Sequence, residues 1–184
     1  QVAHTKLFQE EKERPVLIVV DQSAHMFFGS RRRFKSVAAA RIAALLAWSG
    51  LEQGDRIGGI VFSDEEHREI RPRRSRHSVL RLIHEIDQFN HQLEVSSPTL
   101  NTDALAQALT NARRVCKHGS SIILISDFTR MNDQALLYLQ QLTRYNDVIG
   151  IVISDPLEQQ LPAPDLYTVT DGEQKLPINT ASAS

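Results

Sequence analysis

The sequence has little of several features that would place a protein in a special class. It contains one cysteine, Cys116, among 184 residues, and a single thiol cannot form a disulfide within the chain. No apolar run approaches the ~20 residues needed to cross a bilayer, and no signal-peptide pattern is present. We therefore expect a chain that does not span a membrane and that suits a reducing, cytoplasmic location. Because the chain begins at Gln1 rather than Met, a tether to the inner membrane through other parts of a parent protein stays open.

Neither sign of charge is in excess. The chain has 21 Lys and Arg against 22 Asp and Glu, a formal net charge of −1. Whole-molecule electrostatics therefore gives no reason to expect nucleic acid or direct contact with an anionic membrane. We expect a protein partner and a monomeric chain. The length fits a single domain over residues 1–184, with a lead-in at 1–14 and a weakly structured tail at 172–184.

Short aliphatic runs alternate with helical patterns along the chain. Val16–Val20 is too short for a buried helix and rich in β-branched residues, so it suits a central strand covered on both faces. Further strands are predicted at 55–63, 67–72, 120–126, 148–153 and 166–170, the second of them at a sheet edge. Helices are predicted at 36–51, at 78–90, from 101 or 102 onward, and around 136–142. This alternation predicts an α/β, doubly wound fold with a mostly parallel central sheet and helices on both faces.

Two of these segments carry small residues. The segment 36–51 is rich in alanine and apolar nearly all round, which predicts the most buried helix of the domain. Gly58 and Gly59 should permit a close approach of two backbones. They precede the apolar part of their strand and do not lead into a helix, so they form no nucleotide-binding fingerprint.

A carboxylate closes several of the predicted strands. Asp21 follows 16–20 directly in the sequence D-Q-S-A-H, and Asp127 and Asp155 follow later strands. Ligands of open α/β sheets bind outside the carboxyl ends of the strands. An acid followed by alternate hydroxyl-type positions is therefore a candidate cation site. A plain strand-to-helix turn, in which Asp21 and Ser23 cap backbone amides, is the alternative.

Basic residues gather in two segments. Arg31–Arg33 with Lys35 form one run, and six arginines lie between Arg68 and Arg81. A solvated loop is one explanation of the first run, and an acidic partner is the other. The second segment is a secondary candidate for partner binding.

Several short phrases occur in a defined order along the chain. They are M-F-F-G-S at 26–30, K-S-V-A-A-A at 35–40, Q-G-D-R-I-G-G-I-V-F-S-D at 53–64, I-S-D-F at 125–128 and D-P-L-E at 155–158. With D-Q-S-A-H and the helix-opening N-T-D-A-L, they make the chain resemble the von Willebrand factor A fold. More closely, the chain resembles the bacterial family of unknown function, number 58, often encoded beside MoxR-type AAA+ ATPases.

The resemblance implies a metal-ion-dependent adhesion site, which holds Mg²⁺ or Mn²⁺ and completes its coordination with a partner's carboxylate. Asp21 and Ser23 match the first two positions of that pattern, Thr102 its loop threonine and Asp127 its later aspartate. His25 stands where the pattern has its second serine. An imidazole is larger than a hydroxymethyl group and prefers softer metals. Binding of Mg²⁺ or Mn²⁺ is therefore expected to be weakened or lost.

The resemblance also gives the expected function, a non-enzymatic protein–protein interaction module that works with a MoxR-type AAA+ ATPase. One alternative is a phosphotransfer or hydrolase domain with Asp21 as nucleophile, although Ser23 stands where such enzymes want a second acid. The other is a structural domain with a dead metal site. We further expect a protonated His25 to replace the cation between Asp21 and Asp127, with its pKa raised above ~6.5.

Overall fold

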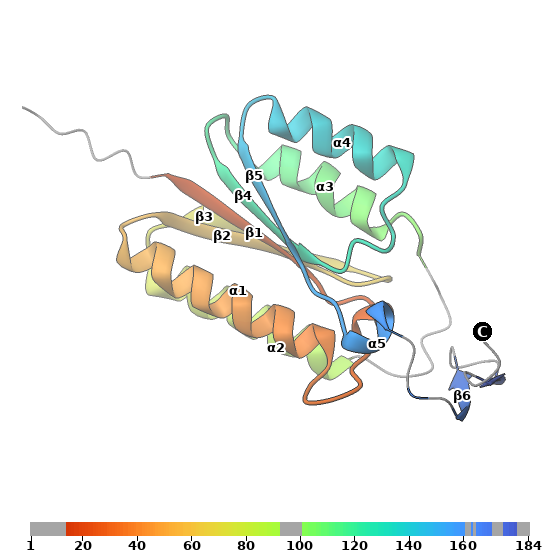
Figure 1. The fold of residues 1–184 in the computed structure, drawn as a ribbon. Helices are drawn as coiled ribbons and strands as arrows, with labels where there is room; N and C mark the ends of the chain where they lie inside the picture. The colour runs from red at the N-terminus through yellow and green to blue at the C-terminus, as the bar shows by residue number, and fades with distance from the viewer. Residues whose placement is uncertain (1–13, 93–100, 161–162, 164, 171–174, 180–184) are drawn as a thin grey trace, which may run out of the picture.

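The computed structural model describes residues 14–92, 101–160, 163, 165–170 and 175–179. Five strands form one sheet in the order β3-β2-β1-β4-β5 (Figure 1). They are β1 (Pro15–Asp21), β2 (Arg56–Phe62), β3 (His67–Arg73), β4 (Ser121–Ser126) and β5 (Asp147–Val152). Neighbours pair in parallel except β2 and β3, which are antiparallel. The predicted α/β fold with a mostly parallel central sheet is confirmed. The predicted lead-in lies outside the described residues except for Arg14.

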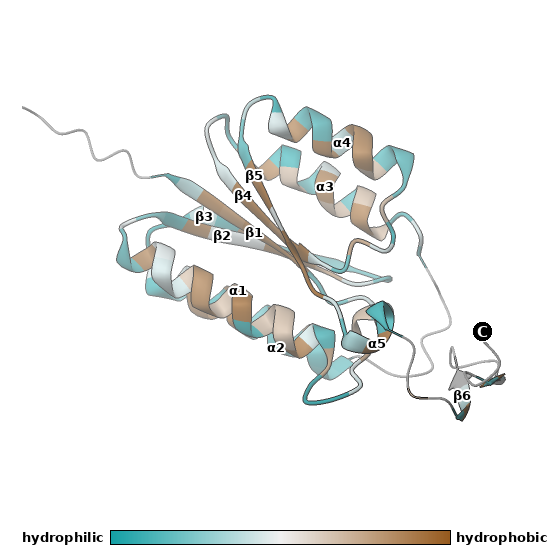
Figure 2. Cartoon of the chain, in the orientation of Figure 1, coloured by the Kyte–Doolittle hydropathy of each residue, from teal (hydrophilic) through white to brown (hydrophobic). Residues whose placement is uncertain are grey.

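Two pairs of helices cover the two faces of the sheet. They are α1 (Lys35–Glu52) with α2 (Arg76–Gln92), and α3 (Ala104–Val115) with α4 (Asp133–Thr143). Figure 2 shows the apolar strands enclosed between these layers. Alternate residues of β1 supply the two cores: Ile18 packs with residues of α1 and α2, and Leu17 with residues of α3 and α4. The aliphatic run at 16–20 is buried because it lies between both layers. No described helix combines the length and the hydrophobicity needed to cross a membrane.

The prediction that the helix at 36–51 is the most buried is wrong. α1 buries a single stripe, made of Lys35, Ser36, Ala39, Ala43 and Ala47, and its Leu45 is 71% exposed. Helix α3 buries six of its 12 residues and is the more enclosed of the two. Alanine is compatible with either side of a helix, so an alanine-rich sequence does not require burial all round.

The two edges of the sheet differ. β3 is an edge strand, as predicted, and Gly58 of its neighbour β2 sits close to it. A Cβ at Gly58 would lie 2.4 Å from the carbonyl oxygen of Ile70, which confirms the predicted close approach of backbones. β5 forms the other edge, where Ile149 and Val152 are 53% and 65% exposed.

The segment after β5 forms small elements of its own. A short helix, α5 (Pro156–Gln159), follows β5 directly. The predicted strand at 166–170 is β6 (Leu166–Thr170), which pairs with β7 (Lys175–Asn179) in a separate two-stranded antiparallel sheet. β7 lies within residues 172–184, for which the sequence predicts a weakly structured tail.

Candidate functional site

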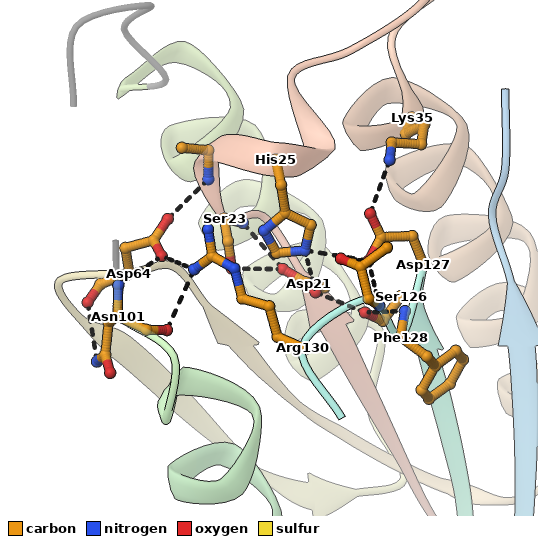
Figure 3. Close-up of polar contacts among 12 residues, drawn as sticks. Asp21, Ser23, His25, Lys35, Asp64, Asn101, Ser126, Asp127, Phe128 and Arg130 are labelled. Carbon is orange, nitrogen blue, oxygen red and sulfur yellow. Dashed lines mark hydrogen bonds and ion pairs between the residues drawn. The ribbon is translucent and has the colours of Figure 1, made fainter. Parts of the chain in front are cut away.

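The carboxyl ends of β1 and β4 bring two acids together from distant parts of the sequence. The two strands are parallel neighbours with Val20 opposite Ile125, so Asp21 lies beside the chain that continues into Asp127. Asp21 is 2% exposed. Its Oδ1 accepts hydrogen bonds from the amide and the hydroxyl of Ser23, at 2.9 and 2.6 Å. Its Oδ2 accepts one from the Ser126 hydroxyl at 2.6 Å (Figure 3).

Asp127 is held by a buried lysine. The Nζ of Lys35 donates to Asp127 Oδ2 at 2.7 Å, and the two side chains are 4% and 3% exposed. Lys35 Nζ also pairs with Glu158 of α5. The other oxygen, Oδ1, accepts from the amide and the hydroxyl of Thr129 at 3.0 and 2.8 Å.

These contacts set the charge states of the pair. Burial opposes ionisation of Asp127, but its contacts with His25, Lys35 and the Thr129 amide outweigh that effect and hold its pKa well below the usual range. Burial likewise opposes the charged form of Lys35, and the carboxylates of Asp127 and Glu158 outweigh it and raise the pKa of Lys35. Both groups are therefore charged at neutral pH.

His25 lies above both acids. It belongs to η1 (Ala24–Met26), a single 3₁₀ turn, and its Nε2 lies 3.1 Å from Asp127 Oδ1 and 3.4 Å from Asp21 Oδ2. Burial favours the neutral ring, but the contacts with Asp127 and Asp21 outweigh it and raise the pKa of His25 to about 9. The predicted rise of this pKa is confirmed, so the imidazole is protonated at neutral pH.

The backbone of the turn after β4 is strained at Phe128, and this turn supports the contacts of Asp127. Phe128 has a φ of 57°, in the left-handed region that residues other than glycine rarely adopt. Its amide donates to the Ser126 hydroxyl at 3.1 Å, and the turn brings Thr129 back onto Asp127. Strain of this kind persists where surrounding contacts fix the backbone.

A second polar cluster, which sequence reasoning missed, lies beside the first. Asp64 follows β2, is 7% exposed, and accepts hydrogen bonds from the amides of Ala24 and Asn101 at 2.8 and 3.2 Å. It also pairs with the guanidinium of Arg130, which donates to the Asn101 carbonyl at 3.1 Å. Asp64 follows the carboxyl end of β2, much as Asp21 and Asp127 lie at the ends of β1 and β4. This common position at a strand end is the signal in the sequence that could have revealed it.

The structure brings together most of the predicted site residues. Asp21, His25 and Asp127 each offer one ligand atom within 4.8 Å of the others, and Ser23 joins them through its bonds to Asp21. Thr102 does not join them. Its side chain is exposed, and among the described residues only its backbone carbonyl takes part in a hydrogen bond.

This arrangement does not fit a hard divalent cation. Mg²⁺ requires near-octahedral oxygen ligands at ~2.0–2.1 Å. All four carboxylate oxygens of Asp21 and Asp127 already face donors of this chain, including the charged nitrogens of Lys35 and His25. Lys35 and His25 place two positive charges among the carboxylates of Asp21, Asp127 and Glu158, so little net negative charge remains to attract an ion.

Comparison with known proteins assigns the family. Residues 1–183 match the model of a family described as "Protein of unknown function DUF58". The chain belongs to the DUF58 family. This result confirms the family resemblance read from the sequence, and no curated protein matches the DUF58 chain.

Solved structures with a similar fold include two bacterial proteins. An aerotolerance-related membrane protein from Bacteroides fragilis NCTC 9343 is 17% identical, with a TM-score of 0.61, over 90% of this chain and 81% of that one. BatB, a conserved hypothetical protein from Bacteroides thetaiotaomicron, is 18% identical, with a TM-score of 0.55, over 76% of this chain and 66% of that one. The match thus covers just under two thirds of BatB. These likenesses show a common fold.

The charge on His25 should make stability depend on pH. The folded pKa of His25 lies above the unfolded value, so its stabilisation is complete below pH ~6.5 and is lost as the pH rises through about 9. A rise from 6.5 to about 9 corresponds to about 3 kcal/mol of unfolding free energy. Urea denaturation between these pH values measures the loss. His25→Gln should remove the slope, whereas His84→Gln, at an exposed position of α2, should preserve it. An unchanged slope in His25→Gln would contradict this account.

Lys35 should be essential to the stability of the strand ends. We expect Lys35→Met to lower the free energy of unfolding by about 3–5 kcal/mol, because it leaves the buried carboxylate of Asp127 without its cation. Chemical denaturation compares it with Arg41→Met, which removes an exposed charge from the same helix. Adding Asp127→Asn to Lys35→Met should recover part of the loss. Equal stabilities of Lys35→Met and Arg41→Met would count against the buried ion pair.

Proposed function

We propose that this DUF58 domain is a non-enzymatic protein-docking module. Its docking surface is the strand-end face, which we define as the carboxyl ends of β1, β2 and β4 with the side chains of His25, Thr102 and Thr129. One observation carries the proposal: residues 21–25, Lys35, Asp64 and residues 126–130 converge there in a network of hydrogen bonds and ion pairs. Burying so many charged groups is costly, and such networks are retained at functional sites more readily than for stability.

The alternative of phosphotransfer or hydrolysis has less support. A nucleophilic Asp21 needs a free oxygen and a base or acid beside it. Instead Asp21 is 2% exposed, and both of its oxygens accept hydrogen bonds from serine hydroxyls. The position two residues on is Ser23, whose amide and hydroxyl both donate to Asp21. A docking role needs no such reactive group.

The fold and the family resemblance together support a proposal for the partner. The fold is that of an interaction or adhesion type of module, and the family resemblance points to a MoxR-type AAA+ ATPase as the protein that docks. One similar structure is described as that of a membrane protein. We therefore propose that other parts of a longer parent protein tether this domain to the inner membrane, on its cytoplasmic side, while the domain itself contacts protein.

We further propose that docking proceeds without Mg²⁺ or Mn²⁺, because Lys35 and His25 supply the positive charge. Either ion should leave the melting temperature of the native chain unchanged within about 1 °C, since an ion that does not bind cannot stabilise. In His25→Ser with Lys35→Met, the acids lose their internal cations, and Mn²⁺ should raise the melting temperature. His84→Ser with Arg41→Met is the matched control. A clear rise in the native chain would refute the metal-free site.

Blocking the strand-end face should abolish binding of a purified MoxR-type ATPase. Thr102 and Thr129 are exposed on this face, so Thr102→Arg and Thr129→Arg add bulk without emptying the core. We expect each to weaken binding at least about tenfold in biolayer interferometry, as disruption of an interface centre does. Thr143→Arg, at the far end of α4, is the control and should bind as the native chain does. Native affinity in both face variants would remove the proposal.

A further inference from the structure

Three arginines beside the strand-end face have no partner in the described chain. Arg31, Arg32 and Arg33 are exposed and make no hydrogen bond or ion pair with any described residue. Arg14, Arg114 and Arg130, in contrast, each pair with an acid, and Arg31–Arg33 are three consecutive arginines without such a pair to any described residue. An unpaired run of like charge is unfavourable to hold together, since the charges repel. A ligand of opposite charge would relieve this repulsion.

The loop that carries these arginines is closed at its base. We call residues 28–34 the arginine loop. The amide of Lys35 donates to the Phe28 carbonyl at 2.8 Å. The ring centroids of Phe27 and Phe34 are 4.2 Å apart. The loop is tight at Gly29, where a Cβ would lie 2.3 Å from the carbonyl oxygen of Arg33. The tip therefore has a defined shape.

Hydrogen bonds between Ser30 and Asp155 fix the arginine loop to the segment after β5. The amide of Ser30 donates to Asp155 Oδ2 at 2.9 Å, and its hydroxyl donates to Asp155 Oδ1. Asp155 also caps α5 by accepting from the amide of Leu157 at 2.9 Å. A loop held at its base and its side loses little conformational entropy when it binds, so its arginines are pre-organised for a ligand.

We propose that the arginine loop binds an acidic segment of the docked protein, an inference that rests on the proposed function. Guanidinium groups form paired, planar hydrogen bonds with carboxylates. Phe28 and Phe34 are 41% and 39% exposed, so the loop also offers apolar contact area beside its charges. Arginine and aromatic residues together are typical of the residues that dominate binding energy at protein interfaces.

Charge and shape favour an acidic protein segment over an anionic membrane or a nucleic acid. The formal net charge of −1 includes these three arginines, so the rest of the chain is net acidic and repels an extended anionic surface. Loops that enter membranes expose apolar groups at their tip, whereas here the phenylalanines lie at the base. No aromatic side chain stands at the tip for bases to stack on.

A labelled oligoglutamate peptide tests the inference by fluorescence anisotropy at low salt. Replacing Arg31, Arg32 and Arg33 by Gln should weaken binding about tenfold, and replacing them by Lys should restore part of it, because charge returns without the paired geometry. The control replaces Arg41, Arg113 and Arg144 by Gln, which removes the same charge from exposed positions outside both basic segments. It should change the affinity less than about twofold.

Results of two kinds in the direct binding assays would overturn the inference, and a third comes from the ATPase assay. One is an equal loss of oligoglutamate binding in the loop and control variants, or no binding at all. The other is tighter, loop-dependent binding to phosphatidylserine vesicles or to a single-stranded oligonucleotide. The ATPase assay separates this inference from the proposed function. If the loop variant keeps native ATPase affinity while Thr129→Arg loses it, the acidic-segment inference fails and the docking function stands.

Discussion

Two carboxylates that meet at the ends of adjacent parallel strands impose the constraint on which this site depends. Asp21 and Asp127 are placed there by the pairing of β1 with β4, and neither can move away without breaking the sheet. Their repulsion in a poorly hydrated place must be offset by positive charge. Lys35 and His25 supply that charge from the segment between β1 and α1. The path of that segment is therefore fixed by electrostatics as much as by packing.

Lys35 is an unusual residue for its position. It is the first residue of α1, whose first turn contains no acid, and a cation is disfavoured at the positive end of a helix. The compensation comes from outside the helix, from Asp127 at the end of β4 and from Glu158 on α5. One ammonium group thus ties the start of α1 to the sheet and to the segment that follows it. Loss of this group would affect three elements at once.

The sequence predicts the scaffold well and the site in part. Alternation of aliphatic runs with helical patterns is enough for the sheet and its two layers, and a parallel sheet alone brings Asp21 beside Asp127. The partnership of Lys35 with Asp127 spans 92 positions, and no local pattern connects them. The same holds for Arg130 with Asp64. The alanine-rich sequence of α1 does not reveal how little of the helix is buried, because alanine fits a helix side that faces solvent as well as one that faces the sheet.

The internal cations also change how such a face can recognise a protein. A bound metal ion leaves a coordination position that a partner's carboxylate fills directly. Here the positive charges lie largely under the surface, with Lys35 at 4% and His25 at 18% side-chain exposure, and each already contacts this chain's own acids. A partner's carboxylate therefore has no vacant position at Asp21 and Asp127. Recognition must rely on groups around the rim that remain unpaired among the described residues, and Arg31–Arg33 are three cations of this kind.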